Sequence, residues 1–178
     1  ELSINGKKKY VHQFQPSKKF KEISTVFNNR YQKLGGYTKF CVLRDPIERI
    51  VSAYKNRVIH FKELGEKTLK MHGINPKLAN PSFPQFVEHF FQYRKVPKIQ
   101  HHTNELNYFL GTDPSYYDKI FNLNNISSLP EFIETKYKIK IDLPHFMTGG
   151  GGAKSIDLNK FKEEEPKLYQ TLVNYTKK

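Results

Sequence analysis

The hydrophobic pattern changes its period abruptly within residues 37–61, and this change constrains the fold more than any other feature of the chain. Residues 37–43 (YTKFCVL) alternate and then run apolar, which is typical of a buried strand. From Asp45 onward the apolar residues instead recur at steps of three and four, which is typical of an amphipathic helix. Asp45 suits the N-cap, Pro46 suits the first helical position, and Glu48 completes a capping box. The sequence therefore predicts a strand, a tight turn and a helix that begins at Asp45.

The same order, a strand followed by a helix, occurs a second time along the chain. Residues 117–123 (YDKIFNL) are typical of a strand, and a capped helix is predicted to begin at Ser128. Strands that alternate with helices favour an α/β domain with a central parallel sheet, in which ligands bind at the carboxyl ends of the strands. Arg44, which follows the first strand, is therefore expected at the ligand-binding edge.

The other segments are interpreted more coarsely. Residues 65–82 carry Gly, Asn and Pro and are predicted to be an exposed connection, whereas residues 84–94 are predicted to be a helix with Phe91 among its inward residues. A last helix is expected over about 158–175. A chain of 178 residues is long enough for one domain with a core and short for two, so residues 1–178 are predicted to form a single domain.

The formal net charge of +13, from 30 Lys and Arg against 17 Asp and Glu, predicts anionic partners. A field of that sign attracts polyanions and phosphorylated small molecules. A surplus of lysine that only keeps the surface soluble is the alternative.

Cysteine and histidine give no sign of a disulfide or a metal site. Cys41 is the only cysteine, so it cannot form an internal disulfide, and within its apolar run it is predicted to be a small buried thiol. His101 and His102 are adjacent, and the side chains of adjacent residues point in different directions. No metal is therefore expected.

The basic residues at the strand-to-helix turn indicate a site for an anion. The first turn of a helix presents backbone N–H groups and the positive end of the helix dipole. Arg44 adds a planar guanidinium that matches two phosphate oxygens, and Ser52, about two turns into the helix, adds a hydroxyl. These residues predict phosphate binding, although an arginine before a capped helix can equally pair with a nearby carboxylate.

The string RDPIERIVSAY, residues 44–54, closely resembles the 3′-phosphate-binding segment of sulfotransferases, in particular the carbohydrate sulfotransferases of family 2. The matching residues are Arg44, Asp45, Pro46, Arg49, Ser52 and Tyr54. The resemblance implies a P-loop-kinase-like fold with three layers around a parallel sheet. It also implies transfer of a sulfuryl group from 3′-phosphoadenosine 5′-phosphosulfate (PAPS) to a saccharide hydroxyl, with Arg44 and Ser52 on the 3′-phosphate. Arg49 is expected either to contact the ligand or to orient the turn through a salt bridge.

A looser likeness to bacterial members of this family lies in HHTNELNYFLG, residues 101–111. By its spacing, His102 takes the position of the histidine or glutamate that acts as base on the acceptor hydroxyl in related enzymes. An imidazole suits this role because its ordinary pKa lies near neutrality. A surface or capping role for His102 is the alternative, with His101 the second choice for the base and Glu105 the third.

The resemblance has two further consequences, one at each end of the chain. Family members close a loop over the donor near the position of the glycine run 149–152, so Lys154 and Ser155 are expected to contact PAPS, with a flexible linker as the alternative. The family's phosphosulfate loop, Pro-Lys/Arg-x-Gly-Ser/Thr, is not found in residues 1–36. The N-terminal segment that carries this loop is therefore expected to be missing from the sequence.

Two other classes of protein compete with the sulfotransferase. A nucleic-acid-binding module would explain the positive charge, but no recognition motif is visible. A small-molecule kinase of similar fold would need a Walker-type Gly-Lys-Ser/Thr loop after a strand, and none is present. The predicted partner is therefore a saccharide, an acidic one suiting the charge, rather than nucleic acid.

The compartment is interpreted from two negative features and from composition. No apolar run approaches the roughly 18 residues of a membrane span, and the start ELSINGKKKY lacks the apolar core of a signal peptide. The composition favours a bacterial cytoplasm, and the Golgi lumen after removal of an N-terminal anchor is the alternative.

Overall fold

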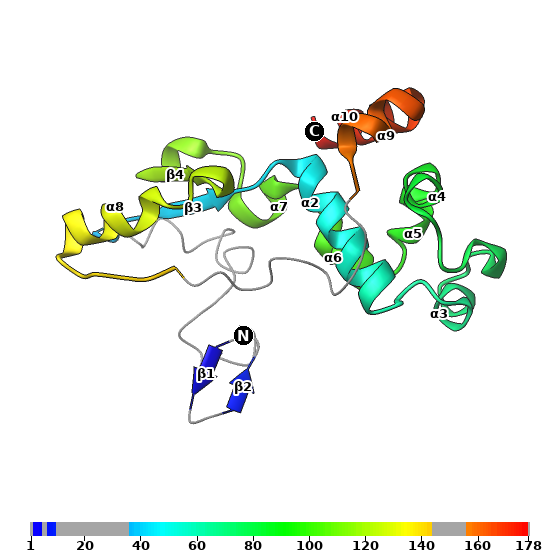
Figure 1. Ribbon diagram of the computed structural model, residues 1–178, viewed down its shortest axis with the longest axis horizontal. Coiled ribbons are helices and arrows are strands. Elements are labelled where there is room, and N and C mark those ends of the chain that lie inside the picture. Colours follow the sequence, from blue (N-terminus) through cyan, green and yellow to red (C-terminus); the bar gives the residue numbers. More distant parts are fainter. Residues whose placement is uncertain (1, 5–6, 10–35, 144–155, 178) are drawn as a thin grey trace. The chain divides into compact units, whose positions relative to one another are not determined.

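The computed structural model describes residues 2–4, 7–9, 36–143 and 156–177 (Figure 1). They belong to two compact units, each described here by itself. Unit 1 comprises Glu1–Arg44 and Leu106–Thr148, and unit 2 comprises Asp45–Glu105 and Gly149–Lys178. The expectation of a single domain over 1–178 stays a prediction.

Unit 1 contains the two strands that the sequence predicts. Strand β3 (Phe40–Leu43) pairs in parallel with β4 (Lys119–Asn122), and Phe40 lies opposite Lys119 in the register. A separate antiparallel pair joins β1 (Leu2–Ile4) to β2 (Lys7–Lys9). The described part of the unit also contains helices α7 (Leu106–Leu110) and α8 (Ser128–Tyr137), with the 3-10 turns η5 (Pro114–Tyr116) and η6 (Leu123–Asn125). The parallel pairing and the helix at Ser128 are confirmed, whereas the three-layer P-loop-kinase-like arrangement stays a prediction.

Aromatic side chains pack the parallel strands against α8. The ring centroids of Phe121 and Phe132 lie 5.4 Å apart, and Phe40 lies 6.0 Å from Phe121 and 6.1 Å from Phe132. Edge-on contacts at these separations are the favoured geometry for aromatic pairs. Cys41 in β3 is buried, and burial raises the pKa of its thiol, as expected for an inert structural cysteine.

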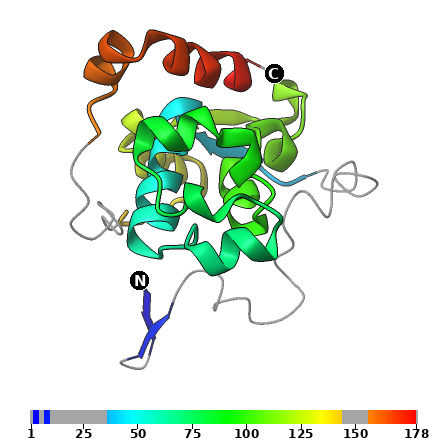
Figure 2. The same cartoon turned by 90° about the vertical axis from the view of Figure 1, so that its right-hand side faces the viewer.

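Unit 2 is helical. Its elements are α2 (Pro46–Ala53), the π-helix η3 (Tyr54–His60), α3 (Glu66–Met71), the 3-10 turn η4 (Pro76–Leu78), α4 (Phe83–Glu88), α5 (Phe90–Tyr93), α6 (Pro97–Thr103), α9 (Leu158–Glu164) and α10 (Pro166–Thr176). Helix α2 packs against α6, and α10 packs against both α2 and α4. Figure 2 shows α9 and α10, in orange and red, above the green helices.

The core of unit 2 forms where the apolar faces of these helices meet. The face predicted for α2 contributes Ile50, and the π-helix contributes Tyr54 and Val58, all buried. Phe86 and Tyr93 stack with their centroids 5.7 Å apart. Burying such side chains stabilises the unit by roughly 1.5–3 kcal/mol each.

Three predictions about unit 2 were wrong in part. The connection predicted over 65–82 contains α3 and η4, and it buries Leu69 and Ile74. The helix predicted over 84–94 divides at His89 into α4 and α5, and this change of direction leaves Phe91 57% exposed. The last helix divides at Glu165, because Pro166 has no N–H to continue the ladder of α9.

Candidate active site

The start of α2 is built as the sequence predicts. The carboxylate of Asp45 accepts a hydrogen bond from the N–H of Glu48 at 2.9 Å, and Pro46 occupies the first turn. The N–H of Arg49 donates to the carbonyl of Asp45, also at 2.9 Å. Asp45 therefore already uses one N–H of the first turn and places a negative charge there, so binding of an anion at this turn must depend on side-chain donors.

The two predicted donors belong to different units. Arg44 directly follows β3 and is the last residue of unit 1, whereas Ser52 lies on α2 in unit 2, and both are half-buried. Because each unit is described by itself, their common site stays a prediction from the motif. Lys154 and Ser155 lie outside the described residues.

Arg49 contacts the backbone far along the chain. Its Nη1 donates to the carbonyl oxygen of Asn104, 55 residues away, and Nη2 of Arg94 donates to the Asn104 side-chain oxygen at 3.0 Å. Burial lowers the pKa of Arg49. A half-buried guanidinium that holds the residue after α6 favours the orienting role over contact with a ligand.

The end of α6 is also held by α10. The hydroxyl of Tyr175 donates to the carbonyl oxygen of Thr103 at 2.7 Å, and Thr103 Oγ1 donates to the carbonyl oxygen of Ile99 at 2.8 Å. The guanidinium of Arg94 lies 4.8 Å from the centroid of the Tyr175 ring. Because the last carbonyls of a helix have no partner within the helix, these contacts fix the last turn of α6, where His102 lies.

His102 is half-buried, whereas His101 beside it is exposed. Burial lowers the pKa of His102 to about 4. The positive charges of Arg57, His101 and Arg49 act in the same direction, and the negative charge of Glu63 opposes them. The imidazole is therefore neutral at pH 7 and has a lone pair to accept a proton. A pKa of about 4 makes a weak base, and a polyanionic ligand bound nearby would strengthen it by favouring the charged form.

An ionic cluster that the sequence analysis missed accounts for the charges near His102. Glu63 Oε1 lies 3.4 Å from Arg57 Nη1 and 3.0 Å from Lys98 Nζ. These residues come from η3, the loop after it and α6. No motif marks them, because their meeting depends on how the helices pack.

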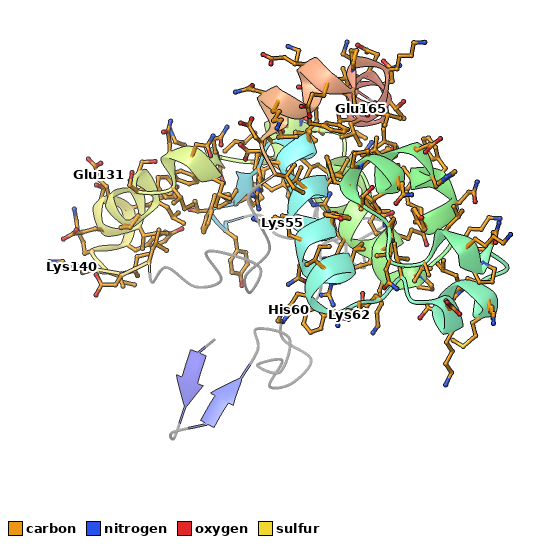
Figure 3. The ribbon with its side chains drawn as sticks, turned by 45° about the vertical axis from the view of Figure 1, so that its right-hand side comes forward. Lys55, His60, Lys62, Glu131, Lys140 and Glu165 are labelled. Carbon is orange, nitrogen blue, oxygen red and sulfur yellow. The ribbon has the colours of Figure 1, made fainter. Side chains whose placement is uncertain are left out.

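A cavity of about 510 Å³ in unit 1 contains none of the predicted site residues. It lies between β4 and α8, and its lining consists of Lys119, Phe121, Ser128, Glu131, Phe132, Thr135 and Lys136. Figure 3 shows Glu131 on α8.

The described residues contain no group of three or more His, Cys, Asp or Glu side chains placed to hold a metal ion. No helix in the described part of the chain has the length and hydrophobicity to cross a membrane.

The parallel strand pair, the helices and the capped turn after β3 are compatible with an α/β sulfotransferase fold. The chain belongs to the sulfotransferase family, whose family 2 model matches residues 2–173. This match includes the residues before Tyr37, where the phosphosulfate loop was not found. No curated protein and no solved structure matches the chain. Membership of the family supports a sulfotransferase activity and confirms the resemblance seen in RDPIERIVSAY.

Proposed function

We propose that the protein transfers a sulfuryl group from PAPS to a hydroxyl of a saccharide, and that Arg44 and Ser52 bind the 3′-phosphate of the donor. The observation that carries this proposal is the capped helix α2, which begins directly after Arg44 within a motif of the family. Sulfotransferases of this family generally use PAPS as donor. Arg44 and Ser52 fit a phosphate, since a guanidinium and a hydroxyl both donate to its oxygens.

His102 is the proposed catalytic base. Its neutral imidazole accepts the proton of the acceptor hydroxyl while the hydroxyl oxygen bonds to sulfur. The bond from sulfur to the phosphate oxygen then breaks, and adenosine 3′,5′-bisphosphate leaves with the electron pair. Lys154 and Ser155 are proposed to contact the donor and to stabilise the charge on the leaving oxygen.

The proposed acceptor is an acidic saccharide, in keeping with the net charge of +13. The family match favours this reading over a kinase or a nucleic-acid-binding module.

Calorimetric titration with adenosine 3′,5′-bisphosphate, compared with adenosine 5′-phosphate, tests the donor site. The wild-type protein should prefer the bisphosphate, and Arg44→Ala should lose at least tenfold in affinity for it with little change for the monophosphate, because charge-assisted hydrogen bonds to the 3′-phosphate are each worth about 1.5–3 kcal/mol. Lys70→Met, which removes an exposed charge from α3, is the matched control. Equal losses for both nucleotides in Arg44→Ala would contradict the assignment.

A further inference from the structure

Helix α2 continues as a π-helix of seven residues, Tyr54–His60. The N–H of Phe61 donates to the carbonyl oxygen of Asn56, five residues earlier, at 3.0 Å. π-Helices are rare, are mostly confined to a single turn and occur frequently at functional sites. The sequence YKNRVIH contains no glycine or proline that would account for one. Packing must therefore hold this segment, and the contacts of its side chains indicate its use.

The π-helix places Arg57 against Glu63. The N–H of Glu63 donates to the carbonyl oxygen of Arg57 at 2.9 Å, so the chain turns back onto the helix at this point. The next residue, Leu64, is buried in the core. The guanidinium of Arg57 also lies 5.0 Å from the centroid of the Phe61 ring. Backbone and side-chain contacts thus hold the pair in one geometry, while His60 and Lys62 project from the end of the helix in Figure 3.

Lys98 joins this pair to the helix of His102. Its Nζ lies 3.0 Å from Glu63 Oε1, and Lys98 belongs to α6, one turn before His102. The side chain of Glu63 is only 10% exposed, whereas that of Lys98 is 69% exposed. Lys98 therefore covers Glu63 from the solvent side, and the pair itself faces inward.

The pair is poorly suited to a purely stabilising role. Glu63 Oε2 and Arg57 Nε are buried, and neither has a hydrogen-bond partner in the described part of the chain. Buried polar atoms without partners cost roughly 1–3 kcal/mol each, and a buried ion pair is often no more stable than a well-packed apolar pair. Stability therefore does not explain why both residues are charged, whereas an effect of their charges on His102 does.

Charged groups of α2, η3, the loop after it and α6 act on the imidazole of His102. Arg49 lies on α2, Arg57 on η3, Glu63 on the following loop and His101 on α6 itself, while Lys98 of α6 contacts Glu63. Arg57 opposes protonation of the imidazole and Glu63 favours it. The two partners of the ion pair therefore act on His102 in opposite directions.

We propose that Arg57 and Glu63 are positioning residues for His102: the π-helix and the contact of Lys98 with Glu63 hold the pair next to α6, where the charge of Arg57 adds to burial in keeping His102 in the neutral, proton-accepting form until substrate binds, and Glu63 holds Arg57 in place. The catalytic meaning of this proposal rests on the proposed function, whereas the coupling of charges is a property of the folded chain alone.

The test is a titration of the histidine Cε1–H resonances by NMR on the full chain, with the signal of His102 assigned from His102→Gln. Arg57→Met should raise the pKa of His102 by about one unit, the order of the shift that a neighbouring like charge causes in a protein. Glu63→Gln should keep the imidazole neutral to still lower pH. Arg57→Lys should restore the wild-type titration because it keeps the charge, and Lys70→Met should leave it unchanged.

The acid limb of the pH profile of kcat/KM for sulfate transfer should move with the titration, upward in Arg57→Met and not in Arg57→Lys. If Arg57→Met is poorly folded by circular dichroism, Glu63→Gln and Arg57→Lys carry the test. A titration of His102 that is the same in wild type, Arg57→Met and Glu63→Gln would overturn the proposal, even in an active enzyme. Absence of transfer from PAPS would instead overturn the proposed function and leave the titration result standing.

Discussion

At the scale of single residues, Arg49 shows how a motif residue can serve the fold. It lies within RDPIERIVSAY, yet its guanidinium donates to the carbonyl oxygen of Asn104, which follows the helix that carries His102. A carbonyl that loses a charged donor in a partly buried site is left desolvated without compensation. Arg49 thus connects the proposed phosphate-binding helix to the proposed base.

Replacement of Arg49 by methionine should destabilise the protein by about 1–3 kcal/mol, since the Asn104 carbonyl loses a charged donor. Urea denaturation measures this change, with Lys70→Met as the control for loss of one positive charge. A variant of unchanged stability that has lost tenfold in affinity for adenosine 3′,5′-bisphosphate would show instead that Arg49 contacts the ligand.

His102 should make stability depend on pH. Its pKa is about 4 in the folded protein against an ordinary value of 6.5, so between these values the unfolded chain binds the extra proton. The free energy of unfolding should therefore fall as the pH is lowered from 6.5 to 4. Denaturation at a series of pH values should show a smaller decrease in His102→Gln than in wild type. Parallel curves for the two proteins would contradict the lowered pKa.

At the scale of elements, the start of α2 depends on local chemistry. The Asp45 carboxylate accepts one of the N–H groups that a helix leaves unpaired. Asp45→Ala should cost about 1 kcal/mol of stability, and Asp45→Ser should recover most of it because a hydroxyl also caps. Thermal unfolding measures both. Asp157→Ala, at the N-cap of α9, is the matched control for a cap outside the family motif. A stable Asp45→Ala variant would show that packing alone sets the start of α2.

The hydroxyl of Tyr175 tests how α10 supports α6. Tyr175→Phe keeps the buried ring but leaves the Thr103 carbonyl without that donor, so the variant should lose about 1–2 kcal/mol. Thr171→Val, which removes an exposed hydroxyl bond within α10, is the control. Hydrogen exchange should become faster in the last turn of α6 for Tyr175→Phe. Unchanged exchange there would show that α10 does not hold this turn.

At the scale of the whole molecule, the charge of +13 bears on the acceptor. Exposed charges are screened over about 10 Å at 0.1 M salt and about 3 Å at 1 M. The KM for an acidic saccharide should therefore rise steeply with salt, whereas the KM for a neutral saccharide should change little. Initial rates at several NaCl concentrations measure both. The same salt dependence for the two acceptors would mean that the surface charge does not select the acceptor.

The local features of this protein could be predicted from the sequence by itself. The strand before Arg44, the cap at Asp45 and the order of the two strand-helix segments, from which parallel pairing was predicted, follow from short-range chemistry and periodicity, and the motif of residues 44–54 was sufficient to indicate the family. Such signals involve residues within a turn or two of each other, so the amino-acid order carries them directly.

Only the tertiary structure decided the surroundings of His102. The structure buries Leu69 in a segment that looked like an exposed loop, and it continues α2 as a π-helix. The contacts of Arg49 and Glu63 with the α6 region join residues 35 to 55 positions apart. Their energies come from packing and desolvation, which no local pattern encodes. The position of His102 in the sequence thus identifies it as the candidate base, and the fold determines whether its imidazole is charged or neutral.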